Sequence, residues 1–429
     1  TRGRARSLRS PPTQGFEAGY TLFVKAKTLT ITDLFCGAGG LSLGLREAGF
    51  EPVRAVDCWA PAVDTYRANL GDHVSSESID DSTVFPYTDV IAGGPPCQGF
   101  SSAGRREADD KRNSLVRVYA DLIARHRPRA FIFENVEGFL TAGRGRFVLD
   151  LLGPLVEAGF QIHLRKINAA NFGVPQHRKR VLAIGGLGWD PGFPEPTHRA
   201  FGAPGSQLTA SRRPPAPTLA EAIAGLPPAS TEPPGDPFEH YSRPLEGVDK
   251  ERAELLSAGQ SMRDLPERLW HESYRRRAYR RVMDGTPREK RGGAPAGVRR
   301  LVGSEPSKAI TGGSLRDFLH PTEDRTLTVR EAARIQTYPD TFTFAGGEAD
   351  RIQLIGNSVP PRLAKAIGMH LLRALRAATV PERAEGRLLS FIPTLSEGRS
   401  PILQEVCELV ERRFAINGVL PLEEGALWR

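Results

Sequence analysis

A short glycine- and proline-rich segment carries the residue with the clearest chemical potential in this chain. Gly93-Gly94-Pro95-Pro96-Cys97-Gln98-Gly99 places Cys97 just after the apolar run 89–92, which predicts a strand. In open α/β sheets, ligand sites lie in the loops that follow the carboxyl ends of strands. A cysteine thiolate in such a loop is a nucleophile, whereas a cysteine within an apolar stretch is more often an inert buried residue. The setting of Cys97 favours the nucleophile.

A nucleophile of this kind needs an acid, basic anchors and a substrate or cofactor loop. Glu134 ends the apolar run 130–133, which argues against an ordinary surface carboxylate, and Gln176-His177-Arg178-Lys179-Arg180 supplies the cations. Positive charge close to a thiol favours its reactive thiolate form. A basic run by itself is more often a solvated face, so these cations are only suggestive in isolation.

The segment Phe35-Cys36-Gly37-Ala38-Gly39-Gly40 follows a β-branched run and precedes a helical one. Glycines in such a turn let the backbone approach a ligand closely. Asp57 ends the next predicted strand, where a carboxylate can receive a ribose. The loop lacks the spaced GxGxxG pattern and a Walker lysine. Two interpretations stay open at this point: a dinucleotide enzyme, or an enzyme that uses a nucleoside cofactor without phosphate, such as S-adenosylmethionine.

Alternating strand and helix patterns must position these groups. The sequence predicts strands over 29–35, 53–57, 89–92, 130–133, 161–167 and 181–184. It predicts helices over 41–48, with Gly49 as the C-terminal cap, and over 115–125, 328–338, 363–377 and 402–414. This alternation is typical of an α/β fold with a Rossmann-like, doubly wound and mostly parallel sheet.

Composition narrows the class of protein. The chain has 429 residues, a net charge of +8 and 39% apolar residues. We find no apolar run long enough to span a bilayer and expect a cytoplasmic protein without membrane contact. Its four cysteines are scattered without a CxxC pair, which argues against zinc and against a disulfide framework. The basic balance is compatible with nucleic acid, although a solvated basic surface is the alternative.

Taken together and in order, five motifs make the chain resemble the DNA (cytosine-5)-methyltransferase family, of the bacterial restriction-modification type. The motifs lie within about residues 29–377 and are Asp33-Leu34-Phe35-Cys36-Gly37-Ala38-Gly39-Gly40, Gly94-Pro95-Pro96-Cys97-Gln98, Glu134-Asn135-Val136, Gln176-His177-Arg178-Lys179-Arg180 and Gly356-Asn357-Ser358-Val359-Pro360-Pro361. The resemblance implies the S-adenosylmethionine methyltransferase fold, S-adenosyl-L-methionine as cofactor, S-adenosyl-L-homocysteine as product and double-stranded DNA as substrate.

The resemblance also implies roles for the catalytic candidates. Cys97 matches the nucleophile that adds to C6 of cytosine, and Glu134 matches the carboxyl group at N3. Arg178 and Arg180 match the two arginines that hold the cytosine carbonyl oxygen, the glutamate and a nearby phosphate. No side-chain base for the C5 proton is identifiable, and water is the alternative. The target cytosine must leave the duplex, because a base inside the stack cannot reach such a site.

Further residues fall where the family contacts its ligands. The expected cofactor residues are Phe35, Ala38, Gly40, Asp57, Cys58, Ile79, Gly94, Pro96, Leu115, Asn357, Ser358 and Val359. The expected DNA contacts are Ser101, Ser102 and Gln176. Two departures stand out: Cys58 occupies a position that is often a bulky adenine-stacking residue, with Trp59 one later, and Ser78 occupies that of the adenine-contacting acid, with Asp80 and Asp81 just beyond.

The same resemblance suggests a division of the chain. We expect a basic tail over 1–27, a catalytic and cofactor-binding domain over 28–185, a smaller inserted target-recognition domain over 186–325, a return to the catalytic domain over 326–379 and a C-terminal helical extension over 380–429. The segment Arg330-Glu331-Ala332-Ala333-Arg334 is expected to organise the recognition domain structurally.

Two other functions remain as alternatives. One is an RNA cytosine-C5 methyltransferase acting on tRNA with the same core; the long arginine-rich insertion favours DNA. The other is a catalytically idle DNA-binding regulator, which predicts a missing nucleophile or acid, yet Cys97 and Glu134 are both present. Candidate partners are a cognate restriction endonuclease or other phage-defence components, and we expect a monomer.

Overall fold

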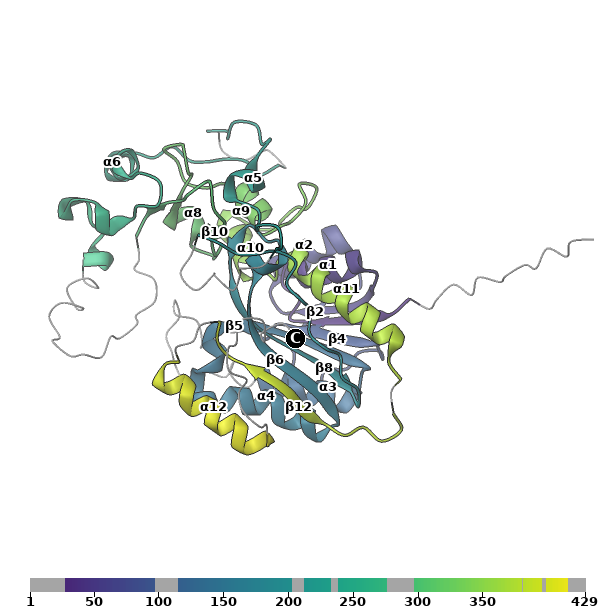
Figure 1. Ribbon diagram of the computed structural model, residues 1–429. Helices are drawn as coiled ribbons and strands as arrows, with labels where there is room; N and C mark the ends of the chain where they lie inside the picture. Colours follow the sequence, from purple (N-terminus) through teal and green to yellow (C-terminus); the bar gives the residue numbers. More distant parts are fainter. Residues whose placement is uncertain are drawn as a thin grey trace, which may run out of the picture.

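The computed structural model describes residues 28–96, 115–202, 212–232, 238–275, 297–379, 381–395 and 399–415. Three residues assigned from the sequence, Cys97, Ser101 and Ser102, lie outside these ranges, as does the expected tail 1–27. The described chain forms a large sheet domain and a smaller lobe of short elements (Figure 1).

The large domain is built on an eight-stranded sheet in the order β12-β6-β8-β5-β4-β1-β2-β3. Its strands are β1 (Thr30–Leu34), β2 (Glu51–Asp57), β3 (Val74–Ser76), β4 (Val90–Gly93), β5 (Ala130–Val136), β6 (Phe160–Asn168), β8 (Lys179–Leu187) and β12 (Arg387–Ile392). Strand β8 runs antiparallel to both of its neighbours, and the remaining pairs are parallel. The expected mostly parallel α/β sheet is confirmed.

Helices cover both faces of this sheet, as doubly wound folds require (Figure 1). On one face pack α3 (Leu115–His126), α4 (Arg146–Glu157) and α12 (Pro401–Phe414); on the other pack α1 (Gly40–Ala48) and α11 (Pro361–Ala377). Successive side chains of a strand point to opposite faces of the sheet. In β5, Phe131 and Phe133 therefore pack with the helices of the first face, and Ala130 and Ile132 pack with those of the second. Gly49 caps α1 in the left-handed conformation that the sequence predicts, with φ of 108°.

The C-terminal extension differs from its expected helical form. Helix α12 is present and buries Val406, Cys407 and Val410 against the sheet domain. Ahead of it, however, β12 joins the sheet as an edge strand, parallel to β6. The run Leu388–Ile392 is short and apolar, a pattern that fits a strand only once a partner strand is known. The extension therefore completes the sheet.

The smaller lobe consists of short elements, some of which surround a small core of their own, while others share a core with α1, α2 (Ala60–Leu70) and α10 (Glu348–Asn357). Its elements include α5 (Leu219–Ile223), α6 (Gly247–Leu255), η5 (Met262–Asp264), η6 (Glu267–Leu269), β9 (Arg299–Arg300), β10 (Ser307–Lys308), α8 (Ser314–Asp317) and β11 (Phe318–Leu319). Leu256, Leu265, Leu269 and Tyr274 pack together there. The lobe falls within the segment expected as the recognition domain, and that role stays a prediction.

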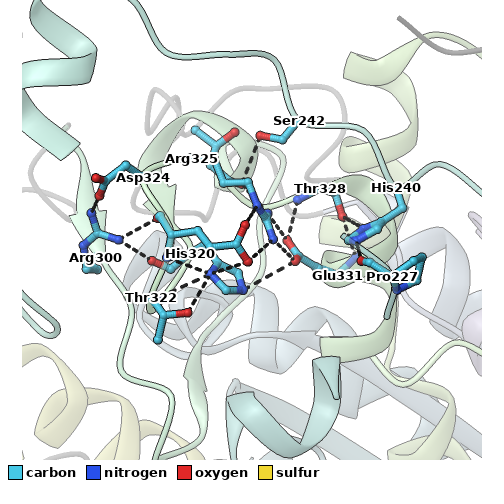
Figure 2. A network of polar contacts seen from close by, with 12 residues as sticks. Pro227, His240, Ser242, Arg300, His320, Thr322, Asp324, Arg325, Thr328 and Glu331 are labelled. Carbon is cyan, nitrogen blue, oxygen red and sulfur yellow. Dashed lines mark hydrogen bonds and ion pairs between the residues drawn. The ribbon is translucent and has the colours of Figure 1, made fainter. Parts of the chain in front are cut away.

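A buried polar network holds the lobe together and ties it to α9 (Val329–Ile335), as Figure 2 shows. The Arg300 guanidinium donates to the carbonyls of Ala253, Leu256 and His320. Arg325 pairs with Glu331 at 2.7 Å, and Glu331 caps the first turn of α9. The expected structural role of the segment that contains Glu331 agrees with these contacts.

Further helices and one short strand complete the described part of the chain. They are α2 (Ala60–Leu70), η2 (Glu137–Leu140), η3 (Ala142–Gly145), η4 (Ala169–Phe172), β7 (Gln176–His177) and α10 (Glu348–Asn357). Strand β7 pairs in parallel with β10 of the lobe. Over the residues that the structure describes, no helix is long and apolar enough to cross a membrane, and no group of histidine, cysteine and acidic side chains could hold a metal ion.

Candidate active site

The candidate site lies at the carboxyl ends of β4 and β5, which are parallel neighbours with Gly93 opposite Phe133. Strand β4 leads into Gly94-Pro95-Pro96, the last described residues before Cys97. The Asn135 side chain donates to the Pro95 carbonyl at 3.2 Å. A Cβ on Gly94 would lie 3.5 Å from Glu134 Oε2. The chain that enters the expected nucleophile loop therefore lies directly against Glu134.

Glu134 pairs with one of the two expected arginines. Strands β5 and β8 are antiparallel, and Arg180 Nε lies 2.9 Å from Glu134 Oε1. Both side chains are nearly buried, with 10% and 13% of their surfaces exposed for Glu134 and Arg180. Oε1 has no aligned hydrogen-bond donor within the described part of the chain, so the contact is an ion pair. A buried carboxylate oxygen in this state can accept a donor from a ligand.

Arg178 requires a correction. The sequence places it with Arg180 on the cytosine, but its guanidinium donates to the backbone carbonyls of Ile310, Gly356 and Ser358 at 2.7–2.9 Å. The side chain is only 1% exposed. These bonds tie the start of β8 to the lobe and to the end of α10, so Arg178 is a positioning residue and not a substrate contact.

Gln176 also requires a correction, because the structure does not support it as a DNA contact. The residue is fully buried, and its amide nitrogen donates to the Ile335 carbonyl at 3.0 Å and to Gln336 at 2.5 Å. Its amide oxygen accepts the Ile310 backbone N–H at 3.0 Å. Both ends of the amide are therefore used inside the protein, where they join β7 to the lobe and to α9.

The turn after β1 has the backbone geometry of a ligand cradle. Phe35, Gly37 and Gly39 all have positive φ, of 61°, 53° and 86°. The Gly37 N–H donates to Asp57 Oδ2, and the Trp59 N–H donates to Oδ1, both at 2.9 Å. Burial raises the pKa of Asp57. Three backbone N–H groups, including that of Cys58, act on the roughly four acceptor sites of the carboxylate, so Asp57 is held in place and can still accept a ribose hydroxyl.

The start of α1 fits closely against the segment Asn357–Val359. A Cβ on Gly40 would lie 2.3 Å from the Val359 carbonyl oxygen and 2.5 Å from Ser358 Oγ. Ser358 Oγ in turn hydrogen-bonds to the Tyr338 hydroxyl. The turn after β1 and the Asn357–Val359 segment, far apart in sequence, therefore pack directly against each other, and a side chain at position 40 would force them apart. The residues present fit a nucleoside cofactor at this place.

The other expected cofactor residues vary in exposure. Ala38 and Ile79 are buried, Leu115 is the first residue of α3, and Asn357 is exposed. Cys58 is exposed as well. Its neighbour Trp59 precedes α2 and packs against a hydrophobic core, so it is available as the large ring next to Asp57. Asp80 Oδ1 accepts two hydrogen bonds within its own turn, from the backbone N–H and the hydroxyl of Ser82.

One buried acid lies beside this cradle without an assigned role from the sequence. Asp33 is 1% exposed, and Oδ2 accepts the Ser42 hydroxyl at 2.6 Å. Burial, opposed by the Ser42 hydrogen bond and reinforced by the negative charge of Asp57, raises the pKa of Asp33 to about 7. The sequence signal for this buried acid was its position inside the apolar run 29–35. A buried strand tolerates an acidic side chain only when that side chain has a partner.

Similarity to known proteins agrees with this site. The family model described as C-5 cytosine-specific DNA methylase matches residues 29–373. The type II methyltransferase M.AgeI of Thalassovita gelatinovora is 33% identical over 78% of this chain and 97% of its own length. M1.HphI of Haemophilus parahaemolyticus is 32% identical over 81% of this chain and 87% of its own.

Solved structures show the same fold. A DNA modification methyltransferase encoded within an E. coli prophage superposes with a TM-score of 0.59 at 24% identity, over 81% of this chain and all of that one. The S. pombe Dnmt2 methyltransferase gives a TM-score of 0.52 at 16% identity over 81% of this chain and 99% of its own. Since the family model spans most of the sequence, the chain belongs to the C-5 cytosine-specific DNA methylase family and is a DNA (cytosine-5-)-methyltransferase.

Proposed function

We propose that the chain transfers a methyl group from S-adenosylmethionine to C5 of a flipped-out cytosine, within a specific double-stranded DNA sequence, through a covalent bond between Cys97 and C6. The observation that carries this proposal is the buried Glu134, paired with Arg180 and packed against the residues that lead into Cys97. Because N3 of cytosine is a hydrogen-bond acceptor, Glu134 would meet it in the protonated form, with Oε1 held 2.9 Å from Arg180 Nε.

The chemistry assigns each residue a step. The Cys97 thiolate bonds to C6, and the electron pair of the C5–C6 double bond moves toward N3 and the carbonyl oxygen. Glu134 shares a proton with N3, while Arg180, held by Glu134, balances charge at that edge of the ring. C5 then gains the methyl group and loses its proton to water, and the C6–S bond breaks to release Cys97.

The cofactor supplies the electrophilic methyl group when it is bound. The residues that would hold it are those of the cradle, with Asp57 toward the ribose and the turn from Phe35 to Gly40 against the rest. Gly40 packs directly against Val359 beside the cradle. Because Gly94 follows β4 beside Glu134, the cradle and the acid are parts of one carboxyl edge of the sheet.

The smaller lobe is the region that would read the DNA. It carries Arg299, Lys308 and Arg316, and arginine side chains bind phosphates or read guanine. Ser101 and Ser102, outside the described ranges, are proposed minor-groove contacts. Relatives named type II methyltransferases support a restriction-modification setting, with a cognate endonuclease as partner, in the bacterial cytoplasm at the nucleoid.

A covalent trap tests the proposal. Wild-type protein with cofactor and duplex DNA containing 5-fluorocytosine should form an adduct that survives denaturing electrophoresis, because the fluorine cannot leave as a proton does. Cys97→Ser should form no adduct and transfer no methyl group while retaining DNA binding. Glu134→Gln should lower kcat by about 10²–10⁴-fold. Full methyl transfer by Cys97→Ser would overturn the mechanism.

Substrate identity is tested separately. Bisulfite sequencing of DNA from cells that express the chain should show methylated cytosine within one short sequence. A methyl-transfer assay with duplex DNA and tRNA side by side should show transfer to DNA. Transfer to tRNA alone would favour the RNA enzyme, and absence of any adduct with wild-type protein would favour the idle regulator.

A further inference from the structure

A small basic cavity lies in the lobe, at its junction with the catalytic domain. Its walls come from the turn at 259–263 and from the segment 299–308, and its volume is about 150 Å³. Ser261 and Arg299 form an antiparallel β-bridge through their backbones, and the Gly259 N–H donates to the Arg300 carbonyl at 3.0 Å. The two walls are therefore fixed to each other by backbone bonds. A space of this size exceeds the ~30 Å³ share of one water and accommodates a larger polar group.

The lining is predominantly cationic. Arg263, Arg299, Arg300 and Lys308 line the cavity together with one carboxylate, Glu305. Arg300 is committed to Asp324 in the network of Figure 2, and Glu305 lies 3.9 Å from Lys308. Arg299 forms no ion pair among the residues whose positions are described, although its charge acts on Asp264, which pairs with Arg263. The charge of Arg299 is therefore only partly balanced and can act on an anion.

A buried hydroxyl gives a second, independent indication of a ligand. Ser307 lines the same cavity and is 2% exposed, yet its Oγ has no hydrogen-bond partner within the described structure. Leaving a buried polar group unsatisfied is costly, so such groups normally have a partner. A hydroxyl donor next to two cations is suited to an oxyanion.

The cavity is connected to the catalytic residues through a short strand pair. Ser307 lies opposite Gln176 and Lys308 opposite His177 in the β10–β7 ladder. Strand β7 continues directly into β8, which carries Arg180 and its ion pair with Glu134. The Arg178 bond to Ile310 fixes the same junction at 2.8 Å. The cavity and the Arg180–Glu134 pair are therefore joined through the β10–β7 ladder and the chain that leads from β7 into β8.

We propose that this cavity is a seat for one backbone phosphate of the substrate DNA, held by the charges of Arg299 and Lys308 and by a hydrogen bond from the Ser307 hydroxyl. The inference rests on the proposed function, because the phosphate belongs to the DNA whose cytosine enters the active site. A phosphate seat fixes the register of the duplex and carries no sequence information. It would hold the backbone while the cytosine leaves the stack.

The test measures DNA binding and not methylation. Fluorescence anisotropy is recorded with two labelled duplexes, one carrying the methylated sequence and one lacking it, over a series of salt concentrations and with S-adenosylhomocysteine present. Arg299→Gln should weaken binding to both duplexes by a similar factor, about tenfold, and lower the slope of log K against log salt by about 1. Ser307→Ala should weaken both complexes and leave the slope unchanged, because it removes no charge.

The matched control is Arg413→Gln, which removes the same charge from α12, where Arg413 pairs with Glu157 on the far face of the sheet. This variant should leave both affinity and slope unchanged. Thermal unfolding of each variant verifies that the fold is intact. An unchanged slope in Arg299→Gln, or a loss confined to the specific duplex with a broadened methylation pattern, would overturn the phosphate seat; the second result would indicate reading of a base edge.

Failure of this proposal is distinguishable from failure of the proposed function. If wild-type protein forms the fluorocytosine adduct and Arg299→Gln binds DNA normally, the phosphate seat is contradicted and the enzyme assignment still stands. Wild-type protein that forms no adduct removes the covalent mechanism, whatever the salt dependence of the variants.

Discussion

Replacing Arg178 distinguishes a positioning arginine from a catalytic one. Arg178→Ala removes three hydrogen bonds from a guanidinium to the carbonyls of Ile310, Gly356 and Ser358. A bond to a charged group contributes roughly 1.5–3 kcal/mol, so three at the lower bound give about 4–5 kcal/mol. Proteins of this kind are stable by roughly 5–15 kcal/mol in total. The loss is therefore large enough to threaten the fold.

The comparison variant is Arg180→Ala, two residues along the chain. Arg180 makes one backbone bond, to Lys179, and one ion pair, to Glu134. Its loss should lower kcat strongly while the unfolding midpoint changes much less than in Arg178→Ala. Arg178→Lys keeps the charge but cannot reach three carbonyls, so it should recover only part of the stability.

Thermal unfolding and binding of S-adenosylhomocysteine by calorimetry measure the difference. Arg178→Ala should unfold many degrees below wild type and bind the product weakly, because Gly356 and Ser358 lose their anchor beside the cradle. An Arg178→Ala protein that unfolds at the wild-type temperature, binds the product normally and loses only kcat would refute the positioning role.

Two further predictions concern the cradle. Burial raises the pKa of Asp33 from its ordinary value of 3.8 to about 7, so the folded state keeps this proton to a higher pH than the unfolded state does. The contribution of Asp33 to stability is complete below about pH 4 and decreases by about 4 kcal/mol as the pH rises to 7. Asp33→Asn should flatten this part of the stability curve, and identical pH dependence in both proteins would contradict the assignment. Gly40→Ala should weaken product binding in calorimetry at least tenfold, since its Cβ would meet the Val359 carbonyl at 2.3 Å. Gly153→Ala in α4, where a Cβ meets nothing within 4 Å, should bind normally, and equal binding by both variants would contradict the tight fit.

Much of the site could be predicted from local patterns. A strand followed by a glycine turn and a helix specifies the cradle within about 20 residues, and Asp57 follows from the end of the next strand. Glu134 follows from the apolar run 130–133 that precedes it within β5. These predictions depend on residues that are neighbours in sequence, so periodicity and turn chemistry were sufficient for them.

Other features depend on partners far away in the chain. Strand β12 became recognisable only through its ladder with β6, more than 200 residues earlier. Asp33 belongs to a motif that the sequence shows, but its pKa is raised by burial and by the charge of Asp57, against the opposing hydrogen bond from Ser42. The cavity at Arg299 exists only because the turn at 259–263 folds back on the strand.

The sequence by itself determined the chemistry of this protein: a thiol after a strand, an acid after its neighbour, two arginines and a glycine turn, in an order that identifies the family. Only the tertiary structure decided which arginine lies at the acid. Arg178 and Arg180 are two residues apart in one motif, yet Arg178 is enclosed by Ile310, Gly356 and Ser358, whereas Arg180 pairs with Glu134. A charged side chain takes its role from the groups that surround it, and here distant segments supply them.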